Sequence, residues 1–177
     1  NDLKVKILEK GAELTSITNL STKAEYLWQA NPIFWGRTAP VLFPIVGALN
    51  NNHFTYQNRN YEMNQHGFAR DMNFEVLKET DHCIRFALRS KAKTTKQVPL
   101  HFALQIEYTL VEKTLTVTYR VINPFLEDLY FSIGGHPAFN CPMQEGDQRS
   151  DYQLVFNENE TASTQLIEAG LRNGKTA

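Results

Sequence analysis

Strict alternation of apolar and polar residues is the property that most constrains what this chain can fold into. From Phe102 to Leu110 every second residue is apolar, and after the polar break Glu112-Lys113 the alternation resumes over residues 114–121. A period of two residues puts apolar side chains on one face of a β-strand and polar ones on the other. Two such runs joined by a short polar break predict an antiparallel hairpin.

Shorter runs of the same kind predict further strands, and no helical period lasts ten residues. The runs cover 5–8, 14–20, 54–56, 60–63, 74–76, 84–88, 129–133 and 152–156, with turns at Asn58-Arg59 and from Glu79 to His82. Short strands separated by turn residues about every 8 to 12 positions are typical of an antiparallel β-sandwich or barrel. We therefore predict an all-β antiparallel sandwich, with residues 1–177 forming a single domain.

Two segments stand outside this pattern. Residues 29–52 contain Pro32, Pro40 and Pro44, and proline cannot donate to a sheet ladder, so we expect an ordered loop that crosses the sandwich. Loops held by a rigid sheet often carry functional residues. Residues 173–177 are polar with turn chemistry, so we expect no strand there and expect the C-terminal part of the domain to be missing.

Charge and cysteine content exclude several classes of function. The chain has 18 basic and 19 acidic side chains, a net charge of −1, and no broad basic run that could bind nucleic acid or an anionic membrane surface. No apolar stretch approaches the roughly 20 residues of a membrane span. The two cysteines, Cys83 and Cys141, are too few for a disulfide framework or a cysteine metal site. We expect a cytoplasmic protein without a metal site.

Two histidines stand out by their surroundings. His66 follows a predicted hairpin and precedes Gly67, with Arg70 four residues later. A histidine in a turn is most often structural, but an arginine at that spacing offers a planar set of donors for hydroxyl groups or an anion. His136 follows Gly134-Gly135, and a glycine pair in a strand marks a bulge, a bend or the close approach of a ligand.

The alternation also predicts where His136 points. It shares a face with Tyr130 and Ser132, opposite the apolar face of the 129–133 run, so it should project away from the core. The alternative is a histidine that merely ends an edge strand before Pro137. An aromatic cluster, comprising Tyr26, Trp28, Phe34 and Trp35, fits either the core, which is the commoner place for such residues, or a platform for a sugar ring.

Three motifs together resemble the aldose 1-epimerase (galactose mutarotase) family. They are IFWGRTAPVLFPIVG at 33–47, HGFAR at 66–70 and GGHPAFN at 134–140. The likeness is greatest to the mutarotase-related branch, which is also similar to the glucose-6-phosphate 1-epimerases. The resemblance extends over essentially the whole chain and implies the family's galactose mutarotase-like supersandwich, a large antiparallel β-sandwich.

The resemblance implies an isomerase that interconverts the α and β anomers of a hexose or hexose derivative by acid/base ring opening, with no metal or organic cofactor. His136 matches the family's general acid, a role suited to a group that titrates near neutrality, and His66 matches the histidine that supports it. Arg70 and Arg37 match arginines that line the sugar site in hexose-phosphate-specific relatives. The expected partner is thus a small-molecule sugar, either a hexose or a hexose phosphate.

Two departures from the family pattern bear on activity. Ala48 stands where mutarotases proper usually have an arginine. The family's general base is a glutamate in a C-terminal strand, beyond residue 177, and we do not assign that role to Glu158, Glu160 or Glu168. An acid without its base cannot complete the proton exchange, so we expect the 177 residues alone to be inactive and to fold poorly.

Two other functions fit the same residues. A non-catalytic carbohydrate-binding protein on the same fold would also hold a sugar near the two histidines. A glycosidase is the weaker alternative, because it needs a carboxyl group on each side of the scissile bond.

Overall fold

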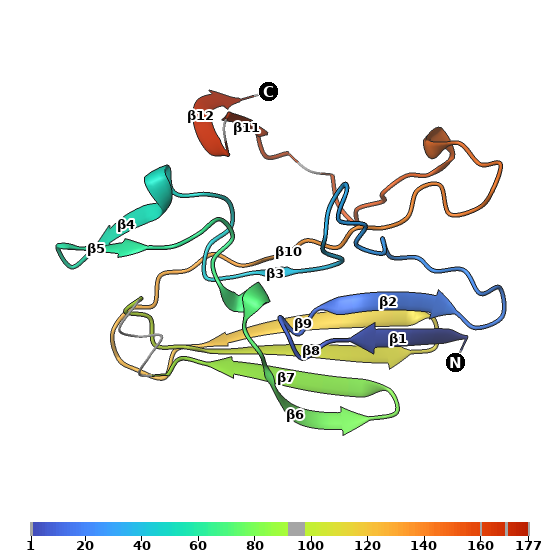
Figure 1. The fold of residues 1–177 in the computed structure, drawn as a ribbon, viewed down its shortest axis with the longest axis horizontal. Coiled ribbons are helices and arrows are strands. Elements are labelled where there is room, and N and C mark those ends of the chain that lie inside the picture. Colours follow the sequence, from blue (N-terminus) through green and yellow to red (C-terminus); the bar gives the residue numbers. More distant parts are fainter. Residues whose placement is uncertain (1, 92–97, 160, 169, 177) are drawn as a thin grey trace.

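A four-stranded antiparallel sheet forms the base of the molecule in the computed structural model, which describes residues 2–91, 98–159, 161–168 and 170–176. Its strands are β6 (Glu75–Thr80), β7 (Cys83–Arg89), β8 (Ala103–Val111) and β9 (Thr114–Ile122), in the order β6-β7-β8-β9 (Figure 1). The turns between β6 and β7 and between β8 and β9 are each two residues long. Both hairpins predicted from the alternation are confirmed.

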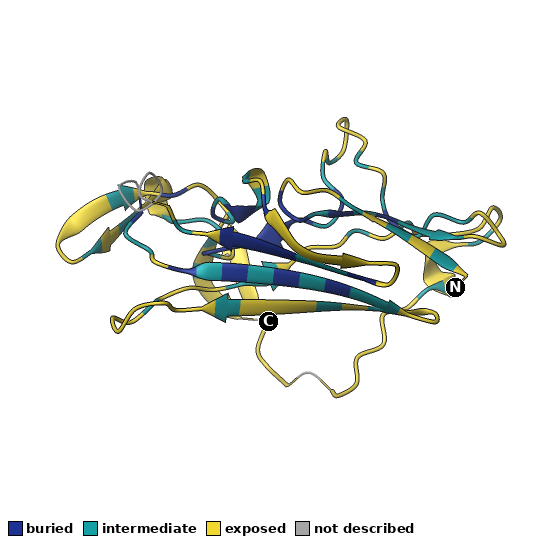
Figure 2. Ribbon diagram, turned by 90° about the horizontal axis from the view of Figure 1, so that it is seen from below, coloured by how far each residue is buried: buried dark blue, intermediate teal, exposed yellow. Residues whose placement is uncertain are grey.

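The two N-terminal strands predicted over 5–8 and 14–20 are present and pair with each other as a hairpin that packs against the core. It consists of β1 (Leu3–Ile7) and β2 (Leu14–Asn19). Buried residues alternate with partly exposed ones along β8, as the two-residue period requires, and Figure 2 shows buried positions concentrated in the central strands. The core cluster draws on both layers and comprises Ala12, Leu14, Leu27, Val41, Phe43, Ala69, Phe74, Phe86, Leu88, Phe102, Leu104, Ile106 and Tyr108.

The proline-rich segment crosses the sandwich as expected but contributes one short strand. β3 (Val41–Leu42) pairs with β10 (Gly134–Gly135), and this two-residue ladder replaces the strand predicted over 129–133. Beyond it, Pro40 and Pro44 accept hydrogen bonds from the backbone N–H groups of His136 and Ser132, but neither proline can donate one in return. The extended 129–133 segment therefore lies beside its neighbour without forming a regular ladder.

The hairpin predicted at 54–63 is present, with its turn one residue earlier than expected. β4 (His53–Tyr56) and β5 (Arg59–Glu62) flank a turn formed by Gln57 and Asn58. Both turn residues have positive φ, 47° and 59°, as a two-residue hairpin turn of the favoured hand requires. Arg59 belongs to the strand, so the prediction of a turn at Asn58-Arg59 is wrong by one position.

The C-terminal region corrects two further predictions. Residues 152–156 alternate in polarity but are in no strand, because no described segment pairs with them. Conversely, β11 (Gln165–Glu168) and β12 (Leu171–Thr176) form a hairpin that turns at Gly170, so most of the polar end is strand and not turn. Residue 177 and Glu160 lie outside the described residues.

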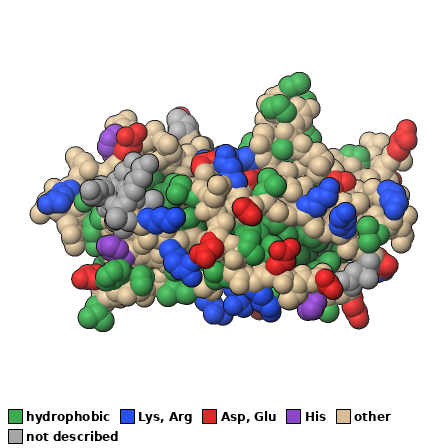
Figure 3. All heavy atoms as spheres, turned by 60° about the horizontal axis from the view of Figure 1, so that its bottom comes forward, with side chains coloured by type: hydrophobic (Ala, Val, Ile, Leu, Met, Phe, Trp, Pro, Cys, Tyr) green, Lys and Arg blue, Asp and Glu red, His purple; other side chains and the backbone are tan. Residues whose placement is uncertain are grey.

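Helical structure is confined to short turns in the described part of the chain. These are the 3₁₀ helices η1 (Asn50–Asn52), η2 (Ala69–Asp71) and η3 (Arg149–Asp151). None of the described helices is long and apolar enough to span a membrane. On the face turned forward in Figure 3, basic and acidic side chains are interspersed, with hydrophobic side chains between them. The all-β class predicted from the sequence is confirmed.

Candidate functional site

Three neighbouring segments bring the predicted site residues together. Phe43 lies between Gly67, with which it forms a parallel bridge, and the segment that leads into β10. Val41 and Phe43 face the core. A side chain added at Gly134 would meet Leu42 and Val46 on the other face, at 3.6 Å and 3.4 Å. A Cβ at Gly134 would therefore be in ordinary van der Waals contact with these two side chains.

His136 is exposed on the outer face, as the alternation predicted. Its backbone N–H donates to the Pro40 carbonyl at 3.1 Å, and its imidazole lies 5.0 Å from the Trp35 ring, centroid to centroid. On the core side of the same strand, a Cβ on Gly135 would lie 2.9 Å from the Tyr119 hydroxyl. The two glycines before His136 thus differ: a Cβ would fit at Gly134, whereas the absence of one at Gly135 allows close packing against Tyr119.

Asn140, which ends the third motif, anchors the segment that follows His136. Its side-chain amide donates to the carbonyl oxygens of Glu25 and Leu27, at 2.8 Å and 2.9 Å. The Glu25 carboxylate in turn accepts from the backbone N–H groups of Ile17 and Leu27. These bonds tie the His136 segment to the N-terminal hairpin.

His66 is held by its backbone and by its side chain. Its N–H donates to the Gly47 carbonyl at 2.8 Å, its carbonyl accepts from Phe43 at 3.2 Å, and its Nδ1 accepts from the Gly47 N–H at 3.0 Å. His66 has φ of 67°, a left-handed conformation unusual for a residue with a side chain. Because Nδ1 is an acceptor, the proton of the neutral imidazole resides on Nε2.

The two histidines lie close together but in different electrostatic surroundings. Their ring centroids are 6.4 Å apart. Burial lowers the pKa of His66 below its ordinary 6.5, and the positive charge of Arg70 and the proximity of His136 lower it further. His66 is therefore kept neutral beside an exposed second imidazole.

The two predicted arginines meet at one carboxylate. Arg37 forms an ion pair with Asp71 at 2.6 Å, and Arg70 Nε lies 3.8 Å from the other oxygen of Asp71. Arg70 also donates to the Gln65 carbonyl at 2.7 Å. Among the described residues, the buried Nε of Arg70 has no hydrogen-bond partner. Burial lowers the pKa of Arg70, and the positive charge of Arg37 lowers it further because the two cations lie close together.

The aromatic cluster is a surface feature and not part of the core. Phe34 is 78% exposed and packs edge-on against Trp28 at 6.1 Å. The Trp28 indole N–H donates to the Trp35 carbonyl at 2.9 Å, which holds Trp35 beside His136. The commoner interpretation, that these aromatic residues form core, is wrong for this cluster.

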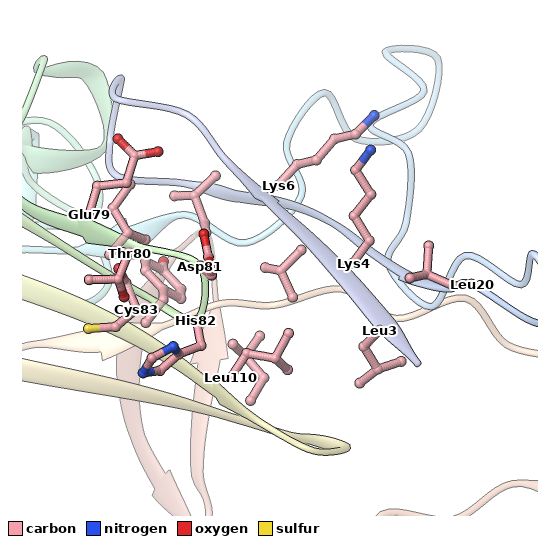
Figure 4. A pocket seen from close by; sticks show the side chains of 15 residues that line it. Leu3, Lys4, Lys6, Leu20, Glu79, Thr80, Asp81, His82, Cys83 and Leu110 are labelled. Atoms are coloured by element: carbon pink, nitrogen blue, oxygen red, sulfur yellow. The ribbon is translucent and has the colours of Figure 1, made fainter. Parts of the chain in front are cut away.

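Two hollows in the described part of the molecule are lined by none of the residues His66, His136, Arg37 and Arg70. One, of about 570 Å³, borders the turn after His66 and is lined by Gly67, Phe68 and Asp71 among others. Another, of about 560 Å³, lies between β1 and the β6–β7 turn (Figure 4). Its lining includes His82 but none of the four predicted site residues. In the described part of the chain no cluster of histidine, cysteine or acidic side chains could hold a metal ion.

Sequence reasoning missed the residues that orient this site. Asp71, which joins the two arginines, directly follows Arg70 in the chain, and that adjacency was the available signal. Gly47 was noticed only as part of a motif, yet both its N–H and its carbonyl bind His66. Ser132 was placed on the His136 face, but its bond to the Val46 N–H had no sequence signature.

Comparison with known proteins decides the family. Residues 1–171 match the aldose 1-epimerase family. This chain is a member of the aldose 1-epimerase family. It is 36% identical over 167 residues to the chromosomal and plasmid forms of Protein LacX from Lactococcus lactis subsp. lactis, a match that covers 91% of this chain and 56% of each relative. The chain thus spans a little over half the length of these relatives.

Solved structures confirm the galactose mutarotase-like fold. A galactose mutarotase related enzyme from Lactobacillus acidophilus superimposes with a TM-score of 0.91 and 38% identity, over 98% of this chain and 58% of that one. A galactose mutarotase-like protein from Lactobacillus casei ATCC 334 gives 0.77 and 37%, over 82% and 49%. The resemblance inferred from the three motifs of this epimerase-family chain is confirmed.

Proposed function

We propose that this member of the aldose 1-epimerase family interconverts the α and β anomers of a hexose or hexose derivative. The observation that carries the proposal is the pair of imidazoles on one outer face, 6.4 Å apart, one exposed and one held neutral. Because the chain spans 56% of its curated relatives, the activity is proposed for a protein of their length that contains these residues.

The chemistry assigns a different task to each histidine. Ring opening breaks the bond between C1 and the ring oxygen while the anomeric hydroxyl loses its proton and becomes the carbonyl. We assign His136 as the general acid that protonates the ring oxygen, because its imidazole is exposed on this face and it matches the family's acid in the third motif. Rotation about the bond to C1 and reclosure by the reverse steps then give either anomer.

His66 suits a supporting role better than the acid role. With Nδ1 occupied by the Gly47 N–H, its Nε2–H can donate a hydrogen bond to the sugar without giving up the proton. Burial and the charge of Arg70 disfavour a cationic His66, so we assign the transferred proton to His136.

We further propose that the substrate carries a negative charge or many hydroxyl groups. Arg37 and Arg70 converge on Asp71 near His66, and one carboxylate cannot balance both positive charges. Guanidinium groups bind phosphate and carboxylate through paired hydrogen bonds. A hexose phosphate therefore fits this pair of cations better than a neutral hexose.

No described residue is assigned as the general base. Glu158 and Glu168 are both exposed. A Cβ on Gly170, two residues after Glu168, would lie 3.7 Å from the Ala48 side chain, so the β11–β12 turn comes near the site. We leave the base unassigned, and we propose that the reaction takes place in the cytoplasm with no metal or organic cofactor.

Polarimetry tests the proposal and separates it from the alternative of a sugar-binding protein. The protein should speed the approach of freshly dissolved α-glucose, α-galactose or α-glucose 6-phosphate to its equilibrium rotation in proportion to its concentration. A binder would show saturable binding by calorimetry and leave the rate unchanged. Binding without any acceleration, for all three sugars, would establish the binding protein and exclude the isomerase.

A further inference from the structure

The segment that holds His66 in place contains Gly47, and it is hydrogen-bonded to the segment that leads to His136. Ser132, four residues before His136, donates its backbone N–H to the Pro44 carbonyl at 2.9 Å and accepts the Val46 N–H on its hydroxyl oxygen at 2.8 Å. The next residue, Gly47, holds the His66 imidazole. One serine therefore connects the two halves of the site.

The hydroxyl of Ser132 substitutes for a backbone partner. The register Gly134↔Leu42 would set Val46 opposite Tyr130 if the ladder continued. Pro44 interrupts that ladder because it has no N–H, and Val46 bonds instead to the serine side chain. The bond fixes the Ile45–Val46 peptide, and the N–H of the next peptide, that of Gly47, reaches His66 Nδ1 at 3.0 Å.

The backbone conformation of His66 indicates that the hydrogen bonds from Gly47 and Phe43 offset an unfavourable local conformational energy. A residue with a side chain resists φ of 67°, and such backbone persists only where the surroundings hold it. Here Gly47 bonds both the backbone and the ring of His66, and Phe43 bonds its carbonyl. Strained residues of this kind cluster at functional sites.

We propose that Ser132 is a positioning residue that keeps His66 in register with His136 and holds the neutral His66 imidazole with its proton on Nε2. The catalytic meaning rests on the proposed function, whereas the tautomer does not. The groups that face His66 and influence its protonation are Arg70 from η2 and His136 from the end of β10.

The test is nitrogen NMR of the His66 imidazole in the parent protein and in matched variants. In the parent, Nδ1 should be unprotonated and Nε2 protonated at neutral pH. Ser132→Ala removes the acceptor and should give a mixture of tautomers and a higher pKa for His66, whereas Ser132→Thr keeps a hydroxyl and should preserve the parent pattern. Ser90→Ala, which removes another serine oxygen that accepts a backbone N–H, at 3.2 Å from Phe102, should leave His66 unchanged.

Sugar turnover gives a second readout. Loss of the hydrogen bond between the Val46 N–H and the Ser132 hydroxyl should lower kcat by about 2- to 10-fold with little change in KM. An unchanged His66 tautomer and titration in Ser132→Ala would overturn the proposal, and so would a parent protein protonated on Nδ1, even if the alanine variant failed to fold. A locked tautomer in a protein without anomer exchange would refute the proposed function alone.

Discussion

Replacing Gly67 by alanine should destabilise the protein more than its backbone conformation alone predicts. Gly67 has φ of 70°, and a Cβ built there would lie 2.3 Å from the Phe43 carbonyl oxygen and 2.7 Å from Pro44 Cδ. Both contacts involve groups that cannot rotate away. Adopting the left-handed conformation costs a residue with a side chain about 1–2 kcal/mol. Relieving the overlap by moving the packed backbone should add about 1–3 kcal/mol.

Gly146→Ala isolates the conformational part of that cost. Gly146 has φ of 94°, and nothing lies within 4 Å of the position a Cβ would take. The free energy of unfolding from urea titration, with both variants made in the same parent protein, should therefore fall by about 2–5 kcal/mol for Gly67→Ala and by about 1–2 kcal/mol for Gly146→Ala. Equal losses in the two variants would show that the overlap with Phe43 has no energetic weight and would refute the packing argument.

Three further predictions follow from the site. Burial, Arg70 and His136 lower the pKa of His66 in the folded protein. The contribution of neutral His66 to stability should therefore be complete above pH 6.5 and should decline as the pH falls from there towards the native pKa. Unfolding titrations at several pH values should show this decline in the parent protein and not in His66→Gln. Gly135→Ala should reduce both stability and sugar turnover, because the new Cβ would lie 2.9 Å from the Tyr119 hydroxyl. Adding Tyr119→Phe removes that hydroxyl and should restore much of both. A double variant no more stable or active than Gly135→Ala would contradict this. Arg70→Ala should weaken calorimetric binding of hexose phosphates by about 10- to 100-fold and of neutral hexoses less, and unchanged affinity for every sugar would make Arg70 structural.

The strands could be predicted where local alternation and pairing agree. The β8–β9 hairpin follows from its period of two and from the polar break at Glu112-Lys113, since a hairpin needs only neighbouring residues. The 129–133 segment has the same period, yet Pro44, which faces Ser132, cannot donate a backbone hydrogen bond to it. A strand depends on its partner, and the identity of that partner is information that a local pattern does not contain.

The candidate site residues could be identified from the sequence, but the hydrogen bonds that connect them could not. His66, His136, Arg37 and Arg70 were named from motifs, and the structure brings them together. Their roles stay predictions. The bond from Ser132 to the Val46 N–H joins positions 86 residues apart. Such long-range contacts depend on how the layers pack, so no spacing rule along the chain could have found them.

Exchange NMR of the α and β anomeric signals of a hexose phosphate and a hexose tests most directly whether the His66–His136 face exchanges anomers. The exchange rate should rise with protein concentration, and His136→Asn should lower kcat by about 10²- to 10⁴-fold while KM changes little, because a general acid acts on the transition state. A parent protein that leaves the exchange of every sugar at its spontaneous rate, or a His136→Asn variant within about twofold of the parent, would contradict the account.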